Sequence, residues 1–398
     1  MAGRKLNLAL IGCGGMASGH LRSYLRIKET EPDLFDLVAC CDPVPELAEK
    51  FADQAAPVQA SKPRVYTDTA QMLAAETLDA ADICCPHAFH HTNGIACLDA
   101  GVNVIIEKPF GITIRASQAL IAAAQRSGRI AATAENVRRG LSQRTAHWLL
   151  HDRKLLGQPR LFFSQAASWS DPAAERNWHW RIEKALGGGG MVMDSGAHYC
   201  DTLRYLFGDV DSVYARVERL EERPHRKGNA SVWDEREDTW IATINFASGL
   251  TGVWSCSTSA PGHSFTQVVY YGTEGCLLDH GDVFHGPFST AEVVLKDGSR
   301  RPMMELQEEF LARLSPAERE RLFPHGWKEG VTLECYDFLT AIRDGRAPEV
   351  DGATGMKAKA IAEAIYESAT TGQVVKMADV LSGQARSYQR EIDERWGL

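Results

Sequence analysis

Residues 6–17 read LNLALIGCGGMA, and this stretch decides the fold of the first part of the chain. Its apolar run, residues 6–11, predicts a buried strand, and the residues that follow have the spacing of a helix. Gly12 permits a tight turn, Gly14 lets the backbone approach a pyrophosphate, and small Ala17 allows close packing of helix on strand. The first amides of the helix would face the phosphates, so the pattern predicts nucleotide binding, although a plain tight turn has the same residues. The residues of this turn expected to contact a cofactor are Gly12, Gly14, Gly15, Met16 and Ala17.

Strand and helix patterns then alternate through the first third of the chain. Further strands are predicted at residues 36–41, 81–85, 103–106 and 130–133, with helical segments at 95–100 and 116–126. Gly101 and Gly128 follow these helical segments, where helix C-caps belong. The alternation predicts an α/β domain with a doubly wound parallel sheet of the Rossmann type over residues 1–138.

Asp42 follows the second predicted strand, where a carboxylate can accept hydrogen bonds from ribose hydroxyls. The residues beside it, Pro43, Val44 and Pro45, include no arginine that could hold a 2′-phosphate. NAD is therefore favoured over NADP as the cofactor. The alternative is that Asp42 only caps the helix that begins near Pro45, which is compatible with either cofactor.

Residues 139–350 show a different pattern. A helix is predicted at 143–150, and amphipathic strands are predicted at 161–167, 239–246, 250–257 and 266–271. Runs of strands predict an α+β domain with a largely antiparallel, open sheet. A sheet covered on one face often uses the other for self-association, so a homo-oligomer, a dimer or tetramer, is expected. Residues 351–398 are expected to form a closing helix and tail that packs back between the domains.

Composition narrows the class of partner. A chain of 398 residues exceeds what one core usually serves, and a formal charge of −9 with no basic stretch argues against nucleic acid. No apolar run approaches the ~20 residues that cross a bilayer, so we expect no membrane partner and a cytoplasmic protein. Several of the ten cysteines lie in strand-like runs as small apolar residues. The segment from Cys84 to His91 lacks the paired spacing of a zinc motif, so no metal is expected.

Two further motifs carry candidate chemistry. Glu107-Lys108-Pro109 ends a predicted strand, so Lys108 would reach the crevice where open α/β sheets bind ligands; the alternative is a surface lysine paired with Glu107. A glycine run at 187–190 leads to Asp194, His198 and Asp201, whose spacing predicts one helical face. A histidine steadied by a carboxylate is a suitable proton acceptor for an alcohol that loses hydride, although such a triplet is also common on ordinary helices.

Together, these three motifs resemble those of the Gfo/Idh/MocA oxidoreductases, in order and spacing and over nearly the whole chain. The resemblance extends to Pro86 and His90, in the loop after the fourth strand, and to Asp351 through Val375, which is similar to the family's closing helix and strand. It implies that the cofactor site also includes Pro86, His90, Glu107 and Lys108. It implies that Lys108 lies by the nicotinamide and the substrate hydroxyl, and that Asp194 and His198 complete the catalytic site, with His198 as general base.

The substrate is expected to be a small carbohydrate. Aromatic and cationic residues concentrate just ahead of the glycine run, and they suit the C–H faces and hydroxyls of sugars, although tryptophans also pack domain junctions. A dehydrogenase acting on a ring hydroxyl of a sugar, glycoside or cyclic polyol fits the site. Two alternatives remain: a redox-neutral, NAD-dependent glycoside hydrolase, on an anionic glycoside for example, and a non-catalytic NAD(H) sensor. The expected substrate contacts are Lys108, Arg138, Trp169, His179, Arg181, Asp194 and His198.

Overall fold

The computed structural model describes residues 4–398, and its contacts divide the chain into two compact units. The first unit contains the chain up to Asn136 together with Trp327–Met356. The second unit contains Val137–Gly326 and Lys357–Leu398. This division differs from the expected one, in which 139–350 formed one domain and 351–398 a separate closing segment.

Six parallel strands form the sheet of the first unit, in the order β3-β2-β1-β4-β5-β6, which confirms the predicted doubly wound sheet. The strand order reverses between β1 and β4, so the carboxyl ends of these two strands form the switch point at which such sheets bind ligands. β3 was not predicted, because it is a partly exposed edge strand of three residues. The strands are β1 (Leu6–Ile11), β2 (Phe35–Cys41), β3 (Arg64–Tyr66), β4 (Ala80–Ile83), β5 (Asn103–Glu107) and β6 (Ala131–Ala134).

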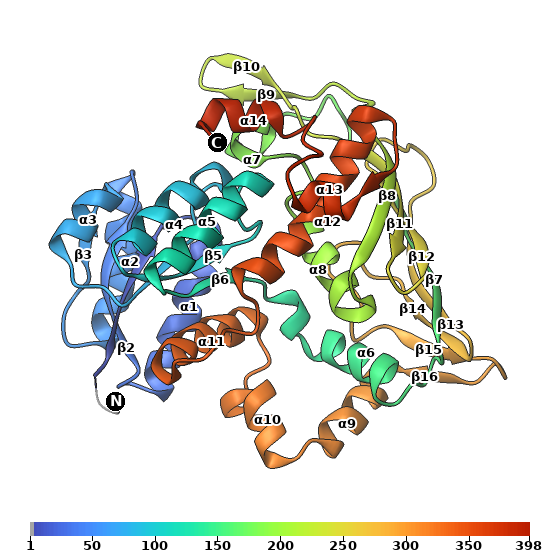
Figure 1. Ribbon diagram of the computed structural model, residues 1–398, viewed down its shortest axis with the longest axis horizontal. Helices are drawn as coiled ribbons and strands as arrows, with labels where there is room; N and C mark the ends of the chain where they lie inside the picture. Colours follow the sequence, from blue (N-terminus) through green and yellow to red (C-terminus); the bar gives the residue numbers. More distant parts are fainter. Residues whose placement is uncertain (1–3) are drawn as a thin grey trace. The chain divides into compact units, whose positions relative to one another are not determined.

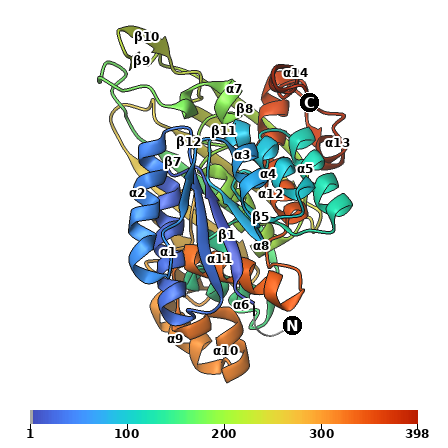
Figure 2. The same cartoon turned by 90° about the vertical axis from the view of Figure 1, so that its left-hand side faces the viewer.

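Helices cover both faces of this sheet. Figure 2 shows α1 and α2 on one side of the strands and α4 and α5 on the other. Apolar side chains of β4, β5, α4 and α5 form a core that includes Ile83, Leu98, Ile106 and Leu120. The helices are α1 (Gly15–Thr30), α2 (Pro45–Ala55), α3 (Thr69–Ala75), α4 (His90–Asp99), α5 (Ile114–Ser127) and α11 (Gly330–Asp344).

Helix α11 belongs to the first unit because it packs on α1. Its buried residues include Leu333 and Phe338, and the helix lies beside α1 (Figure 1). Thr332 Oγ1 donates a hydrogen bond to Ser23 Oγ at 3.1 Å, and Tyr336 OH donates one to Glu31. The sequence pattern of α11 shows an amphipathic helix, but only these contacts show which unit it covers.

The second unit is built on a mixed sheet of nine strands, in the order β16-β15-β14-β13-β7-β12-β11-β8-β17. All its pairs are antiparallel except β7 with β12, so the predicted, largely antiparallel sheet is confirmed. A separate hairpin pairs β9 with β10. The strands are β7 (Pro159–Ala167), β8 (Val210–Glu218), β9 (Pro224–Lys227), β10 (Ala230–Trp233), β11 (Thr239–Phe246), β12 (Thr251–Ser257), β13 (Phe265–Gly272), β14 (Gly275–Asp279), β15 (Glu292–Leu295), β16 (Arg300–Pro302) and β17 (Val375–Lys376).

Helices α8 and α12 cover one face of the nine-stranded sheet (Figure 1). The ring of Tyr199 in α8 lies 5.2 Å from that of Trp254 in β12, and Ser368 Oγ in α12 accepts a hydrogen bond from the amide of Ala215 in β8 at 2.9 Å. Helix α12 begins in the first unit and continues into the second from Lys357. The other helices are α6 (Leu141–His151), α7 (Lys184–Gly187), α8 (Gly196–Phe207), α9 (Met303–Arg313), α10 (Pro316–Leu322), α12 (Gly352–Thr371), α13 (Met377–Leu381) and α14 (Arg390–Trp396).

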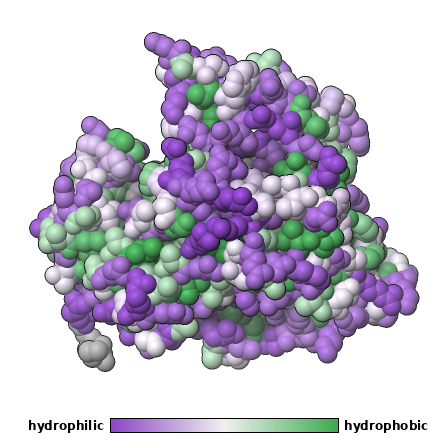
Figure 3. Space-filling model, turned by 45° about the horizontal axis from the view of Figure 1, so that its top comes forward, coloured by the Kyte–Doolittle hydropathy of each residue, from purple (hydrophilic) through white to green (hydrophobic). Residues whose placement is uncertain are grey.

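Short 3₁₀ helices lie in the connections between the longer elements. In the face that Figure 3 shows, apolar residues form small separate patches among hydrophilic ones. Among the described residues, no helix has the length and apolar character needed to span a bilayer. The 3₁₀ helices are η1 (Ala56–Val58), η2 (His87–Phe89), η3 (Val137–Arg139), η4 (Trp180–Ile182) and η5 (Pro324–Gly326).

Candidate functional site

The glycine turn after β1 has one packed side and one open side. Gly12 has a backbone φ of 87°, and a Cβ there would lie 2.8 Å from backbone atoms of Cys84 and Cys85 at the end of β4. A Cβ on Gly14 or Gly15 would meet no atom within 4 Å. Because α1 begins at Gly15, with Gly14 as its N-cap residue, the open side presents the first amides of the helix, which suits a pyrophosphate. Met16 is partly exposed beside the turn, and Ala17 is buried under it.

Asp42 connects two loops at the carboxyl ends of β1 and β2. Its Oδ2 accepts a hydrogen bond from the amide of Cys13 at 2.8 Å, and its Oδ1 accepts one from the amide of Val44 at 2.9 Å. The N-cap residue of α2 is Val44, so the alternative that Asp42 merely caps this helix is wrong. The carboxylate fixes the glycine turn and stands beside it, where the Rossmann geometry brings a ribose.

Pro86 and His90 lie after β4, on either side of η2. The His90 ring is fully buried, with Nδ1 3.0 Å from the carbonyl oxygen of Pro109 and Nε2 2.9 Å from that of Cys85. Burial lowers the pKa of His90. The ring therefore joins the loop after β4 to the loop after β5, and it shapes the cofactor side of the sheet through these two backbone segments.

Glu107 is the last residue of β5, and Lys108 follows it directly. The Glu107 carboxylate is buried, and its Oε2 accepts a hydrogen bond from the backbone amide of Lys108 at 3.0 Å. Its Oε1 lies 2.9 Å from Nε2 of His20 in α1. The carboxylate thus holds the backbone from which the Lys108 side chain extends, at the same sheet edge as the glycine turn.

The glycine run of the second unit is held by two side chains that the sequence did not indicate, the half-buried Glu237 and the buried Tyr366. Glu237 accepts hydrogen bonds from the amides of Gly190 and Val192, at 3.0 and 2.8 Å, and from Tyr366 OH at 3.0 Å. A Cβ on Gly189 would lie 2.6 Å from the Tyr366 hydroxyl oxygen. Burial raises the pKa of Glu237. Tyr366 leaves no room for a side chain at Gly189, and Glu237 leaves none at Gly190.

Asp194 lies in a turn and not in a helix. Its amide donates a hydrogen bond to the carbonyl oxygen of Gly190 at 2.9 Å, and α8 begins two residues later at Gly196. The prediction that Asp194 shares a helical face with His198 and Asp201 is therefore wrong for Asp194. The glycine run keeps the chain in a tight turn up to the start of the helix.

Arg181 and Asp194 form an ion pair, so two predicted site residues are brought together. Arg181 Nε donates to Asp194 Oδ2 at 2.7 Å, and its guanidinium lies over the Trp180 ring, 4.2 Å from the centroid. The Arg181 side chain is 38% exposed, so part of the guanidinium faces solvent. The arrangement presents a carboxylate and a cation side by side, which suits the hydroxyls or an anionic group of a ligand.

His198 lies in the first turn of α8, close to a second histidine that the sequence did not indicate. The ring centroids of His198 and His285 are 5.3 Å apart, and His285 Nδ1 lies 2.9 Å from Asp282 Oδ2. Burial opposes ionisation of Asp282, but hydrogen bonds from His285 and from the amide of Phe284 lower its pKa overall. His285 is far from His198 in sequence, and no pattern linked them.

Arg138 and Asp201, also predicted around the site, bind each other. Arg138 Nε and Nη2 lie 2.6 and 2.5 Å from the two carboxylate oxygens of Asp201, and both side chains are buried. The guanidinium also lies over the Tyr205 ring, 5.2 Å from its centroid. This bidentate pair joins η3 to α8, the helix that carries His198, so Arg138 supports that helix from the side.

His179 and Trp169 lie in the loop region between β7 and α7. The His179 ring meets the ring of His225 edge-on at 5.6 Å, and burial and the nearby Arg236 lower the pKa of His179. Trp169 is 43% exposed and pairs through its backbone with Ser259. Both residues are open enough to contact a ligand of the second unit.

In the segment from Cys84 to His91, Cys84 and His90 have hydrogen-bond partners within the protein. Cys84 Sγ donates to Asp82 Oδ1 at 3.2 Å, and both His90 nitrogens face backbone carbonyls. Within residues 4–398, two groups of side chains have metal-like proximity, and both include the buried His20. The expectation that no metal is bound stays a prediction.

The first unit has a glycine turn at the switch point of a doubly wound sheet, and the second unit has an open sheet. This combination is typical of the class of dinucleotide-dependent oxidoreductases. Residues 6–135 match the model described as "Oxidoreductase family, NAD-binding Rossmann fold", and residues 147–278 match the GFO/IDH/MocA C-terminal domain. The chain belongs to the GFO/IDH/MocA family of oxidoreductases, and its cofactor is NAD. The resemblance of the three motifs is thereby confirmed.

Individual relatives are similar over most of their length. D-apiose dehydrogenase of Paraburkholderia graminis is 28% identical over 386 residues, which cover 93% of this chain and 89% of the relative. D-glucoside 3-dehydrogenase of Escherichia coli is 28% identical over 259 residues, which cover 63% and 69% of the two chains. A solved structure of levoglucosan dehydrogenase in complex with NADH superposes with a TM-score of 0.77 at 23% identity, covering 94% of this chain and 99% of that one, which shows a shared fold.

Proposed function

We propose that this protein is an NAD-dependent dehydrogenase that oxidises a ring hydroxyl of a sugar, glycoside or cyclic polyol. The observation that carries the proposal is the sheet edge of the first unit, where a phosphate turn open at Gly14 and Gly15 and the residue Lys108 follow strands of one parallel sheet. The names of the relatives, D-apiose dehydrogenase and D-glucoside 3-dehydrogenase, support a carbohydrate substrate. When bound, NAD accepts the hydride.

Lys108 is proposed to stabilise the alkoxide that develops as the hydroxyl loses its proton. A cation near the hydroxyl lowers its pKa, and the effect is large where water is excluded. Glu107 fixes the backbone amide of Lys108, so the side chain starts from a defined position. Asp42 is proposed to bind the ribose hydroxyls of NAD, and Pro86 and His90 to shape the nicotinamide side of the site through their loops.

In the second unit, His198 is proposed as the general base that takes the hydroxyl proton. Asp194, held by Arg181, is proposed to orient the substrate hydroxyls. Trp169 and His179 are proposed to bind the remainder of the substrate, and Arg138 to act through Asp201 by holding helix α8.

The test measures two quantities. Turnover with a panel of sugars, inositols and glycosides is followed by NADH absorbance, and the affinity for NAD is measured by isothermal titration calorimetry. Lys108→Ala should lower kcat by roughly 10²–10⁴-fold and leave NAD binding within about threefold of wild type. Lys62→Ala is a matched control, because Lys62 is an exposed lysine of the same unit that pairs with Glu49 and Asp53. Near-normal turnover in Lys108→Ala would exclude its catalytic role.

Two alternatives share the same NAD site. A redox-neutral glycoside hydrolase would release sugar from a glycoside with no net NADH, and a sensor would bind NAD without converting any substrate. The relatives named as dehydrogenases favour net oxidation. Following NADH and released sugar in the same reaction separates the three functions.

The open face of the nine-stranded sheet is proposed as a surface for self-association. Its strand register places six exposed apolar residues on the face opposite α8 and α12, and Ile241 is the most exposed of them, at 56%. Apolar residues gathered on one sheet face mark an interaction surface. The six residues are Leu161, Phe163, Tyr214, Ile241, Phe265 and Tyr271.

Light scattering tests this surface. We expect a dimer or tetramer for the wild type, and Ile241→Lys should lower the mass toward that of the 43.8 kDa chain. Leu220→Lys changes an equally exposed residue outside the strands and should leave the mass unchanged. A wild type that is monomeric at micromolar concentration would exclude the proposal.

A reducing compartment such as the cytoplasm is proposed for the protein. All ten cysteines are free thiols, and seven of them are buried. Thiols of this kind persist where glutathione and thioredoxin keep them reduced. Fractionation of the native cells followed by immunodetection tests the location.

A further inference from the structure

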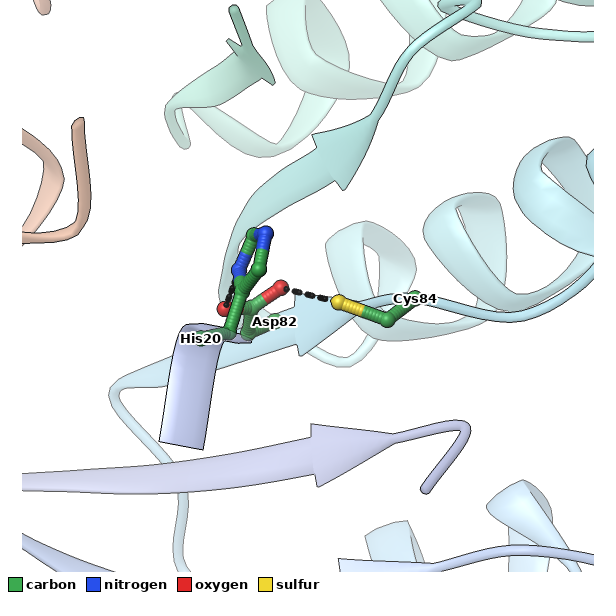
Figure 4. A group of neighbouring side chains, drawn as sticks. All are labelled: His20, Asp82 and Cys84. Atoms are coloured by element: carbon green, nitrogen blue, oxygen red, sulfur yellow. Dashed lines mark hydrogen bonds and ion pairs between the residues drawn. The ribbon is translucent and has the colours of Figure 1, made fainter. Parts of the chain in front are cut away.

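A fully buried histidine lies at the centre of the first unit. His20 is in α1, five residues after the start of that helix, and its side chain has no exposed surface. Its Nδ1 lies 2.7 Å from Asp82 Oδ2 in β4, and its Nε2 lies 2.9 Å from Glu107 Oε1 in β5. Figure 4 shows His20 and Cys84 approaching the Asp82 carboxylate from different sides. The ring therefore joins one helix to two neighbouring strands.

The chemistry of the two acceptors fixes the protonation of the ring. Each ionised carboxylate can only accept a hydrogen bond, and a neutral imidazole has a single N–H to donate. Both contacts are satisfied together only when the ring is an imidazolium with two N–H groups. Burial disfavours the charged ring, but the charge of Asp82, its hydrogen bond and the other groups around the ring together outweigh burial and raise the pKa of His20 well above its usual value.

Other groups face the same ring from every side. Tyr24 OH in α1 donates to Asp82 Oδ2 at 2.8 Å, and Cys84 Sγ donates to Asp82 Oδ1 at 3.2 Å. From α11, Glu334 Oε1 lies 3.7 Å from Nε2, and Cys335 Sγ lies 3.8 Å from Nδ1. Three of the groups around the ring are carboxylates, Asp82, Glu107 and Glu334, so the surroundings favour the protonated ring.

The link from His20 leads to Lys108. Glu107 holds Nε2 of His20 with one carboxylate oxygen and the backbone amide of Lys108 with the other. The helix that carries His20 begins at the glycine turn, where the pyrophosphate of NAD is expected. One buried network thus connects the phosphate-binding helix with the end of the strand that presents the lysine.

We infer that His20 is a positioning residue: as an imidazolium between Asp82 and Glu107, it fixes the end of β5 against α1 and so sets the direction in which Lys108 extends. The inference rests on the proposed function, because it assumes that Lys108 acts in catalysis. Its consequence is a selective effect on kcat, since a small misplacement of a catalytic group slows the reaction while the cofactor site stays formed.

His20→Gln tests the inference, because a glutamine amide can donate to one carboxylate but must present its oxygen to the other. We expect kcat to fall on the order of 10²-fold, with KM and the Kd of NAD within about threefold of wild type. Adding Glu107→Gln restores complementarity, since the amide introduced on β5 can donate to the amide oxygen introduced on α1 and still accept from the backbone N–H of Lys108. The double variant should recover to within about tenfold of wild type.

Tyr24→Phe is the matched control. It removes a hydrogen bond to the same Asp82 carboxylate but none to Glu107, so kcat should stay within about threefold of wild type. The protonation of His20 is read separately in the wild type by ¹⁵N chemical shifts of labelled histidine. Both ring nitrogens should carry protons at neutral pH, where a histidine with the ordinary pKa of about 6.5 is mostly neutral.

The outcomes separate the two claims. Absence of turnover in the wild type with every substrate would overturn the proposed function, and the ¹⁵N spectrum would still decide the state of His20. Normal kcat in His20→Gln, no recovery in the double variant, or an unprotonated ring nitrogen at neutral pH would overturn the role of His20 alone. If His20→Gln does not fold, Glu107→Gln alone tests the role, because its single amide oxygen cannot accept from both the imidazolium and the Lys108 amide. A normal kcat in that variant would overturn the role of His20.

Discussion

The glycine turn gives the sharpest prediction, because the same substitution at two positions of one turn should damage two different properties. Gly12→Ala places a side chain at a φ of 87°, which costs about 1–2 kcal/mol, and pushes its Cβ to 2.8 Å from the backbone of Cys84 and Cys85. Backbone cannot move aside as a side chain can, so the overlap adds about 1–3 kcal/mol. The total of about 2–5 kcal/mol should lower the melting temperature by roughly 4–20 °C.

Gly14→Ala should leave stability almost unchanged. The φ of Gly14 is −88°, which any residue adopts, and its Cβ would meet no atom within 4 Å. Alanine leaves the unfolded chain less conformational freedom than glycine does, which stabilises the folded state by about 0.4–1 kcal/mol. Alanine is also a poorer N-cap residue than glycine, which offsets a few tenths of a kcal/mol of this gain. The new methyl group would instead stand where the pyrophosphate approaches, and NAD should bind about tenfold to a hundredfold more weakly, which is about 1.4–2.8 kcal/mol.

Thermal unfolding without ligand and titration calorimetry with NAD measure the two effects. Gly12→Ala should melt early and, below its melting temperature, still bind NAD; Gly14→Ala should melt like the wild type and show a reduced NAD-induced shift. Equal melting temperatures for Gly12→Ala and wild type would refute the packing argument. If Gly14→Ala binds NAD as tightly as the wild type, the phosphates of NAD do not bind at the open side of the glycine turn.

Three further predictions concern buried charges. Asp201→Asn leaves the guanidinium of Arg138 without its carboxylate, and we expect the free energy of unfolding, measured in urea, to fall by about 3–5 kcal/mol. A decrease of less than about 1 kcal/mol would contradict the stabilising role of this buried pair. Glu237→Gln offers poorer acceptors to the donors around the glycine run and should cost about 1–3 kcal/mol, with faster proteolysis at the run as a second measurement. The raised pKa of His20 implies that its stabilisation is fully present below its unfolded pKa of about 6.5 and is lost as pH rises through the higher folded value. The difference in unfolding midpoint between wild type and His20→Gln should therefore shrink toward alkaline pH, and a constant difference would contradict this.

The sequence predicts the first unit's sheet well because its signals are local. An apolar run, a glycine turn and a helix follow one another within residues 6–30, and the strand at 103–107 ends in the charged Glu107-Lys108 pair. β3 escaped prediction because three partly exposed residues carry no apolar run. The packing of α11 in the first unit could not be predicted, because its periodicity indicates an apolar face but not the element that this face packs on.

The candidate site was only partly predictable, since its supports are distant in sequence. His20 meets Asp82 and Glu107 across 62 and 87 positions, and Tyr366 meets Glu237 across 129. One signal was available: a histidine on the apolar face of α1 and an aspartate inside an apolar strand both need buried partners. The i, i+4 spacing of Asp194 and His198 led to a wrong prediction for Asp194. Such spacing places two residues on one face only if both lie in the same helix, and α8 begins at Gly196, after Asp194.

Arginine pairs with two buried carboxylates of the second unit, whereas a histidine pairs with the buried carboxylates beside Lys108, and this difference predicts how pH acts on Lys108. In the second unit, guanidinium groups pair with carboxylates, as in Arg138 with Asp201 and Arg223 with Asp238, and a guanidinium keeps its proton at every pH at which the protein is folded. In the first unit, the cation between Asp82 and Glu107 is an imidazolium, which can lose its proton. Deprotonation would leave one carboxylate facing a lone pair and would loosen the strand end that carries Lys108. An alkaline decline in turnover that His20→Gln removes would therefore originate in this network, whereas a decline that persists in that variant would originate in the groups that exchange protons with the substrate.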